Sequence, residues 1–195
     1  MVGIDEAGRG PLAGPVAVGV VRVPVGFDWA LVPGVGDSKQ LKAEDRDAIF
    51  RQAWQLRRRG ACYWSVALVG LSIIDTRGFV PAIEIAMRRA LRRAAPEPHT
   101  CQVLLDGALI APPQYENQTT IIKGDATEPV IGLASVLAKV TRDRYMVRIA
   151  AEPQFAPYQF ATHKGYGTKA HRECIKKLGL SPEHRSTYCK NILIL

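Results

Sequence analysis

Apolar residues recur along the chain with two different periods. Short runs rich in valine, isoleucine and leucine predict strands, and apolar residues three and four positions apart predict helices. The predicted strands cover residues 2–8, 14–24, 61–70, 101–107 and 119–125. The predicted helices cover residues 42–60, 80–96 and 128–152, with a shorter helix near residues 168–179.

The order of these elements favours an α/β fold. The first strands follow one another as a possible series of hairpins, and the later strands mix with helices, so we expect a mixed sheet. Residues 1–152 form the predicted core of this fold. Residues 153–195 are basic and loop-rich, and we expect them to form a small helical part packed on the core, within a single domain overall.

Acidic residues follow the apolar runs of three predicted strands. Asp5 ends the first of them and is followed directly by Glu6, while Asp106 and Asp125 close the fourth and fifth. Strand ends at one edge of a sheet bring side chains together, and this edge is a common place for a site in α/β proteins. For Asp5 and Glu6 alone, a polar strand end facing water is an equally good interpretation.

Gathering four carboxylates has an electrostatic cost. Two unit charges ~4 Å apart repel by ~1 kcal/mol in water and by ~4 kcal/mol at an effective dielectric constant of about 20. Either some of the acids have raised pKa values, or cations lie between them. Oxygen ligands without nearby cysteine or histidine favour Mg²⁺ or Mn²⁺, and two such ions would suit an in-line phosphoryl displacement.

The glycines after the first acids do not form a dinucleotide-binding motif. Gly8, Gly10 and Gly14 have the wrong spacing, because that motif requires glycine at the position of Ala13. The motif must also open a helix, whereas Pro15 and the valines after it predict a strand. A phosphate-binding loop with the GxxxxGK[ST] pattern is absent from the sequence as well.

The composition indicates a globular protein with a polyanionic partner. The chain has 195 residues, 47% of them hydrophobic, and a formal net charge of +8. A basic balance of this size favours nucleic acid among the possible partners, although it is weak evidence alone. The four cysteines are far apart and form no CxxC pair, which is typical of reduced thiols in the cytoplasm. We also expect a monomer, without a secretory leader or a membrane partner.

Two polar segments are candidates for binding phosphates. In "HKGYGTKAHR", residues 163–172, Lys164 can meet phosphates and Tyr166 can stack on a sugar or base. A solvated basic loop with the tyrosine packed inward is the alternative. In "GDSKQL", residues 36–41, Lys39 lies in a predicted turn, although Ser38 could simply cap a helix start there.

Together these motifs resemble the bacterial ribonuclease HII family. The resemblance rests on "GIDEAGRGPLAGPV", "DSKQL", "LLDG", "KGD", "ASVLAKVTRDR" and "HKGYGT…H", which occur in this order from Gly3 to about Arg185. It implies a ribonuclease H-like fold: a five-stranded mixed sheet flanked by helices, with a helical C-terminal part.

The resemblance also implies an activity and its residues. Members of the family hydrolyse the RNA strand of RNA–DNA hybrids and incise duplex DNA 5′ of an embedded ribonucleotide, leaving 3′-hydroxyl and 5′-phosphate ends. Mg²⁺ or Mn²⁺ is the implied cofactor, with two ions expected when substrate is bound. The catalytic and metal-binding acids fall on Asp5, Glu6, Asp106 and Asp125.

The resemblance places substrate-binding roles on further residues. The turn that reads the ribose 2′-hydroxyl falls on Gly8, Arg9 and Gly10, the junction-sensing tyrosine on Tyr166, and a phosphate-binding lysine on Lys39. The chain departs from the family's pattern at Gly78 and Phe79, where relatives carry asparagine and isoleucine, and at Thr187 and Tyr188, where they carry serine and phenylalanine. We expect the change at Gly78 and Phe79 to affect local packing only.

Two alternatives stay open at this point. The first is a related metal nuclease of the same fold, of the ribonuclease HIII type, although Arg9 in the glycine turn and the lack of an extra N-terminal domain favour type HII. The second is a non-enzymatic nucleic-acid-binding protein, which would gain nothing from acids at strand ends. We expect a fifth acid, Asp143, to be structural and to pair with a nearby arginine.

Overall fold

A single mixed sheet organises the computed structural model, which describes residues 1–36, 38 and 40–193. Its strands lie in the order β3-β2-β1-β4-β5. Strands β1, β2 and β3 form two antiparallel pairs, whereas β4 lies parallel to β1 and β5 parallel to β4. The strands are β1 Val2–Ala7, β2 Val16–Arg22, β3 Tyr63–Val69, β4 Val103–Asp106 and β5 Gln118–Ile121.

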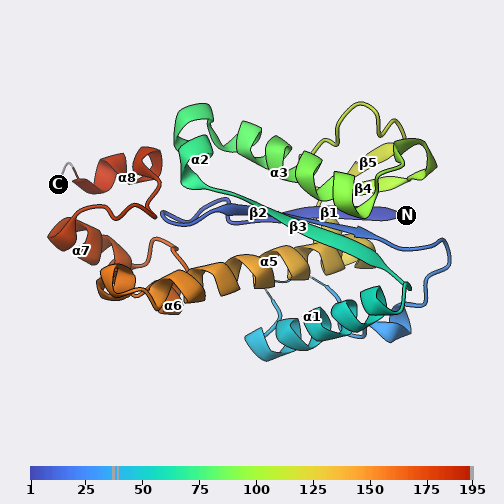
Figure 1. Cartoon of the computed structure of the whole chain (residues 1–195), viewed down its shortest axis with the longest axis horizontal. Helices are drawn as coiled ribbons and strands as arrows, with labels where there is room; N and C mark the ends of the chain where they lie inside the picture. The colour runs from blue at the N-terminus through green and yellow to red at the C-terminus, as the bar shows by residue number, and fades with distance from the viewer. Residues whose placement is uncertain (37, 39, 194–195) are drawn as a thin grey trace.

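Helices cover both faces of this sheet (Figure 1). Helix α3 lies on one face and α5 on the other, with α1 packed outside α5. The helices are α1 Ala43–Arg58, α2 Leu71–Arg77, α3 Phe79–Ala94, α4 Gly124–Thr127, α5 Pro129–Ala150, α6 Phe160–His163, α7 Lys169–Leu178 and α8 Ser186–Leu193. Short 3-10 turns span Trp29–Leu31, Pro98–Thr100 and Pro153–Tyr158. The predicted five-stranded mixed sheet flanked by helices is confirmed.

Helix α5 approaches the sheet closely because glycines replace side chains beneath it. A Cβ on Gly3 of β1 would lie 2.3 Å from the carbonyl oxygen of Val130, and one on Gly19 of β2 would lie 2.3 Å from that of Ala134. Both distances are far below a van der Waals contact, so only glycine permits this approach. The close contact brings the polar residues of α5 next to the acids of β1.

One predicted strand end is wrong. Residues 119–125 were expected to form a strand that closes on Asp125, but β5 ends at Ile121 and Asp125 lies in the short helix α4. The chain turns at Lys123, whose φ of 56° is left-handed. A left-handed residue followed by glycine ends a strand, so Asp125 reaches the edge of the sheet from a helical turn.

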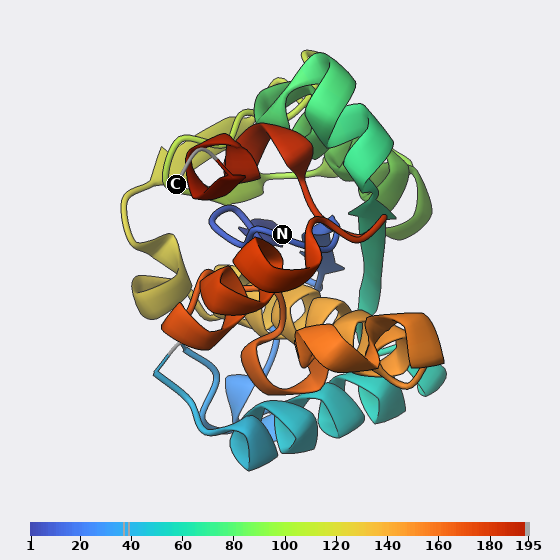
Figure 2. The same cartoon turned by 90° about the vertical axis from the view of Figure 1, so that its left-hand side faces the viewer.

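The C-terminal helices cover the end of the molecule where the connection between β1 and β2 emerges (Figure 2). Backbone hydrogen bonds join the two parts: Leu12 donates to the carbonyl of Gly165, Gly14 to that of Glu183, and Arg185 to that of Leu12. The glycine-rich connection is thereby held from the C-terminal side. Within the described ranges, no helix combines the length and the apolar character that crossing a bilayer requires.

Candidate functional site

Acids from three elements gather at one edge of the sheet. Asp5 on β1 and Asp106 at the end of β4 each lie one residue beyond the paired residues Ile4 and Leu105 of these neighbouring parallel strands. Asp125 at the start of α4 reaches the same place, because its backbone N–H lies 3.4 Å from Oδ1 of Asp106 and donates to it. The structure therefore brings Asp5, Asp106 and Asp125 together.

The surroundings of Asp5 disfavour the charged form of its carboxyl group. Its side chain is only 4% exposed. Burial raises its pKa well above the usual value, and the negative charges of Glu6 and Asp106 raise it further. Hydrogen bonds from the Ser135 hydroxyl and from the Glu6 backbone N–H, the latter 2.7 Å from Oδ1, act in the opposite direction. Asp5 is thus held in a place that disfavours its charge.

Serines extend the hydrogen bonding around Asp5. The hydroxyl oxygens of Ser135 on α5 and Ser38 lie 2.7 Å apart, and both residues are buried. The Ser135 hydroxyl also faces Asp5 and favours the charged form of its carboxyl group. The two serines therefore form a buried polar contact beside Asp5.

Glu6 has a cationic partner of its own. The Arg9 guanidinium donates to Oε1 of Glu6 through Nη2 at 2.8 Å and Nε at 3.0 Å. The Glu6 side chain is 11% exposed and that of Arg9 63%, so the arginine covers the carboxylate from the solvent side. Arg9 also lies over the ring of Phe79, with Cζ 5.3 Å from the ring centroid. Phe79, where relatives carry isoleucine, therefore contacts a residue of the site.

The donor chemistry of this acid group fits a hard divalent cation. Its side chains offer carboxylate oxygens, and a positive ion would relieve the repulsion that raises the pKa of Asp5. In the part of the chain that the structure describes, no three His, Cys, Asp or Glu side chains are arranged to hold one ion together. Ion binding would therefore have to draw the carboxylates closer together.

The glycine turn after β1 is fixed from behind by two fully buried arginines. Arg185 donates to the carbonyl of Gly8 at 2.8 Å, of Arg9 at 3.2 Å and of Gly14 at 2.9 Å. Arg142 on α5 donates to the carbonyls of Ala13, Pro15 and Lys164 at 2.9, 2.9 and 3.0 Å. The two arginines thus hold the turn through its backbone carbonyl oxygens.

The two glycines of the turn have different reasons to be glycine. Gly8 has a φ of +97°, and a Cβ there would lie 2.4 Å from Nε of Arg142. Gly10 has no atom within 4 Å of the place where its Cβ would be, so the space beside it is open. Gly8 is required by packing, whereas Gly10 leaves its backbone bare on the side of the cavity.

A cavity of about 470 Å³ lies between Glu6, the glycine turn and Tyr166. Tyr166 is 40% exposed, and its ring lies 5.6 Å from Nζ of Lys139 and 5.6 Å from Cζ of Arg142. The ring is therefore open to the cavity and does not pack into the core. The lining residues are Glu6, Ala7, Gly8, Arg9, Gly10, Ser38, Lys139 and Tyr166.

Lys164, proposed from the sequence, is not among the residues that line this cavity. The Lys164 ammonium donates to the carbonyl of Ala161. Lys39 lies outside the described residues. Lys139, which sequence reasoning passed over, takes the cationic position at the cavity.

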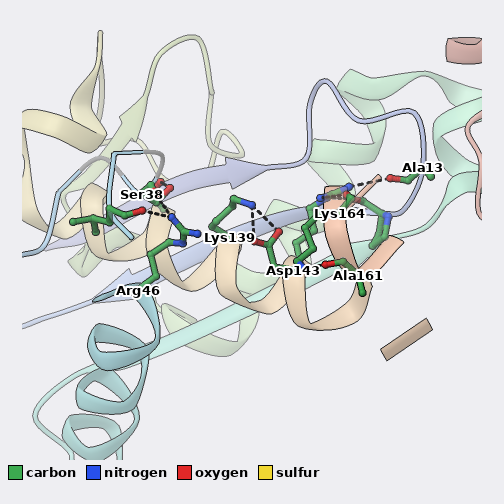
Figure 3. A network of polar contacts seen from close by, with 11 residues as sticks. Ala13, Ser38, Arg46, Lys139, Asp143, Ala161 and Lys164 are labelled. Carbon is green, nitrogen blue, oxygen red and sulfur yellow. Dashed lines mark hydrogen bonds and ion pairs between the residues drawn. The ribbon is translucent and has the colours of Figure 1, made fainter. Parts of the chain in front are cut away.

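The expected arginine partner of Asp143 is wrong. Lys139 donates to both carboxylate oxygens of Asp143, at 2.6 and 2.7 Å, across one turn of α5 (Figure 3). The spacing of four residues places the two side chains on one face of the helix, whereas the guanidinium of the adjacent Arg142 donates to backbone carbonyls instead. Asp143 therefore orients the lysine that lines the cavity.

Sequence reasoning missed Ser135, Lys139, Arg142 and Arg185. Three of them lie inside the segment "ASVLAKVTRDR", which marked the resemblance without showing which side chains face the acids. Their roles depend on contacts across the sheet and the C-terminal segment, and no local spacing encodes these contacts.

The comparisons with known proteins agree with this geometry. The family model for ribonuclease HII matches residues 2–191. The chain belongs to the ribonuclease HII family. It is 42% identical over 188 residues to ribonuclease HII of Endomicrobium trichonymphae and 43% identical over 188 residues to that of Syntrophotalea carbinolica, in each case over 96% of this chain and 84% of the relative. The protein is therefore an endoribonuclease of the type 2 ribonuclease H class.

Solved structures agree on the fold. The ribonuclease H2 from Pyrococcus horikoshii has a TM-score of 0.70 at 25% identity, covering 98% of this chain and 95% of that one. A ribonuclease HII from Archaeoglobus fulgidus, solved in a complex with PCNA, has a TM-score of 0.74 at 23% identity, covering 98% and 96%. A ribonuclease HIII in complex with Mn²⁺ has a TM-score of 0.64 at 17% identity, covering 91% and 62%, and shares the fold.

Proposed function

We propose that this endoribonuclease hydrolyses the RNA strand of RNA–DNA hybrids and nicks duplex DNA on the 5′ side of a single embedded ribonucleotide. Cleavage there leaves 3′-hydroxyl and 5′-phosphate ends. The observation that carries the proposal is the place where the acids meet. Asp125 donates to Asp106, Asp106 and Glu6 act on the charge of Asp5, and Glu6 lines a cavity that also exposes the glycine turn and Tyr166.

Asp5, Glu6, Asp106 and Asp125 are the proposed ligands of Mg²⁺ or Mn²⁺. Two such ions, when bound with substrate, would activate a water and neutralise the leaving oxygen. The chain's own contribution is to hold carboxylate oxygens against their mutual repulsion. The buried Ser38–Ser135 contact lies beside Asp5, and Arg9 covers Glu6 until substrate enters.

The glycine turn is the proposed reader of the ribose 2′-hydroxyl. The carbonyls of Gly8 and Arg9 accept hydrogen bonds from Arg185. A trans peptide points its N–H away from its carbonyl, so the N–H groups of Arg9 and Gly10 point away from Arg185. The open space beside Gly10 lets a sugar approach these donors. Only the 2′-hydroxyl distinguishes RNA from DNA at one nucleotide, so such donors can provide the selectivity.

The remaining groups around the cavity are proposed to bind the rest of the substrate. Tyr166 would stack on the sugar or base at the RNA–DNA junction, and Lys139, oriented by Asp143, would face a phosphate. Lys39 and Lys164 remain proposed phosphate contacts farther along the strand. The four free cysteines suit a reducing compartment, and we propose a cytoplasmic monomer.

The test is cleavage of a duplex that carries one ribonucleotide. The wild-type protein should nick it in the presence of Mg²⁺, and Asp106→Asn should lower the rate by about 10³-fold, which corresponds to about 4 kcal/mol of transition-state stabilisation. Asp47→Asn is the matched control, since it removes an exposed acid paired with Arg144 and should not change the rate.

Three results would contradict the proposal. Undiminished cleavage by Asp106→Asn would remove the acids from the chemistry. Cleavage that requires several consecutive ribonucleotides would favour a ribonuclease HIII type of substrate. Salt-sensitive binding without turnover in any divalent metal would favour a nucleic-acid-binding protein.

A further inference from the structure

Three histidines, two of them buried, form a group next to the backbone of Tyr166. His171 is fully buried and His184 is 5% exposed, although each carries two polar ring nitrogens. The rings of His163 and His171 stack with centroids 4.1 Å apart. In the described part of the chain, these histidines belong to no group of side chains that could hold a metal ion.

The hydrogen bonds of His171 and His184 run in one direction. Nδ1 of His184 lies 2.9 Å from the backbone N–H of Ser181, which can only donate, so this nitrogen accepts and Nε2 carries the proton. Nε2 of His184 lies 3.0 Å from Nε2 of His171, which therefore accepts. Nδ1 of His171 then carries the proton, and it donates to the carbonyl of Tyr166 at 2.8 Å.

Both rings must be neutral for this chain of hydrogen bonds to exist. A second proton on His171 would put two N–H groups face to face. Burial and the neighbouring histidines agree with the neutral forms, since they lower the pKa of His171 and of His184 to about 4. At neutral pH the chain from Ser181 to the Tyr166 carbonyl is intact.

The chain of hydrogen bonds ends on the backbone carbonyl of Tyr166, the residue that is proposed to contact substrate. Among the described residues, the Tyr166 ring has cation–π contacts with Lys139 and Arg142, each 5.6 Å from its centroid, so its position depends largely on its backbone. The backbone N–H of Tyr166 donates to the His163 carbonyl at 2.8 Å, and the carbonyl accepts from His171. His184 also forms an isolated backbone bridge with Ala13, behind the glycine turn.

We infer that His184 and His171 are positioning residues that set the place of Tyr166 relative to the glycine turn. The inference rests on the proposed function, because it assumes that Tyr166 contacts the nucleotide at the cleavage site. His184 connects the C-terminal segment to the turn through its backbone bridge with Ala13. His171 connects the same segment to Tyr166 through its hydrogen bond to the tyrosine carbonyl. They should therefore affect substrate recognition beyond any effect on stability.

The first variant for the test is His184→Phe. Phenylalanine keeps the ring contacts with Tyr158 and Phe160, whose centroids lie 4.9 and 5.5 Å from that of His184, but it removes the donor to His171. His184→Gln, whose amide can again donate toward His171, is the conservative variant. Phe155→Leu, in the apolar cluster beneath Tyr158 and Phe160, is a control for lost packing alone.

The readout is kcat and KM on two substrates, a duplex with one ribonucleotide and a continuous RNA–DNA hybrid. We expect His184→Phe to lower kcat/KM about tenfold more on the single-ribonucleotide duplex than on the hybrid, and His184→Gln to restore most of this loss. In a Tyr166→Ala background, His184→Phe should add no further preference, because both variants act through the same ring.

The inference would be overturned if His184→Phe lost kcat/KM equally on both substrates, in proportion to its fall in melting temperature, as expected for Phe155→Leu. It would also be overturned if the effects of His184→Phe and Tyr166→Ala on substrate preference were fully additive. If His184→Phe does not fold, Ser181→Ala is the substitute, because it removes the hydroxyl that lies 2.8 Å from Nδ1 of His184. Ser181→Ala should change the substrate preference in the same direction but by a smaller factor. A wild-type protein that cuts neither substrate would instead contradict the proposed function.

Discussion

Charged side chains are buried both at the sheet edge, where Asp5 lies, and behind the glycine turn, where Arg142 and Arg185 lie, but their surroundings differ. Arg142 and Arg185 are fully buried, and each donates to three backbone carbonyls. Burial lowers the pKa of Arg185 only to about 10, so it stays charged at neutral pH. Asp5, in contrast, is buried beside two further acids that raise its pKa.

The difference separates a scaffold from a site. A buried charge whose donors meet carbonyl acceptors is already compensated, and it fixes the turn in one conformation. Buried carboxylates that repel one another are compensated fully only when a cation arrives. The arginine region therefore determines the shape of the site, and the acid region determines what it binds.

The largest expected effect on stability comes from the arginine region. Arg185→Met keeps an apolar stem but leaves three buried carbonyls without their donor, which should lower the free energy of unfolding by about 3 kcal/mol. Chemical denaturation measures this loss. The control is Arg144→Met, at a side chain that is 53% exposed, which should change stability by less than about 0.5 kcal/mol. Equal effects of the two variants would remove the distinction between scaffold and surface arginines.

The acid region should respond in the opposite direction. Asp5→Asn removes a buried charge and its repulsion with Glu6 and Asp106, so it should raise the free energy of unfolding while abolishing cleavage. Thermal and chemical unfolding without divalent ions measure the gain, with Asp47→Asn as the surface control. A stability loss in Asp5→Asn would show that the carboxylates do not crowd one another.

A smaller effect is expected in the pH dependence of stability. The pKa of His171 and His184 is lowered to about 4, so their contribution is complete above about pH 6.5 and is lost as the pH falls through about 4. The raised pKa of Asp5 acts with the opposite sign, because its contribution is present below the ordinary aspartate pKa and is lost as the pH rises through the raised value.

Unfolding between pH 4 and pH 7 separates the two contributions. The stability of His184→Phe should fall less steeply with acid than that of the wild type, by about 1 kcal/mol over this range, and Asp5→Asn should fall more steeply. Identical pH slopes in all three proteins would contradict the assigned neutral histidines and the raised pKa of Asp5 together.

The strands and long helices could be predicted because their patterns are local. The alternation of valines in residues 16–20 and the apolar residues at helical spacing in residues 42–60 specify elements whatever lies around them. The end of β5 could not be predicted, since "TTIIKGD" has strand propensity up to the left-handed turn at Lys123. Helices α2 and α8 were missed because both are short, with seven and eight residues, and gain their stability from tertiary contacts.

The acids of the site could be predicted from the residue types at strand ends. The charged groups that surround and support the site could not. That Arg9 pairs with Glu6 follows from a spacing of three residues, whereas the carbonyls that Arg185 binds lie more than 170 positions earlier in the chain. Such long-range contacts to backbone atoms leave no pattern of side-chain types in a single sequence.

The most direct test of the central claim is Mg²⁺ binding by the protein without nucleic acid. At constant ionic strength, Mg²⁺ at tenfold its dissociation constant should stabilise the wild type by about 1.4 kcal/mol, read as a rise in melting temperature. Asp5→Asn should start from a higher melting temperature and gain much less from Mg²⁺. An equal Mg²⁺-dependent rise in both proteins would contradict the claim that these carboxylates are gathered to hold divalent ions.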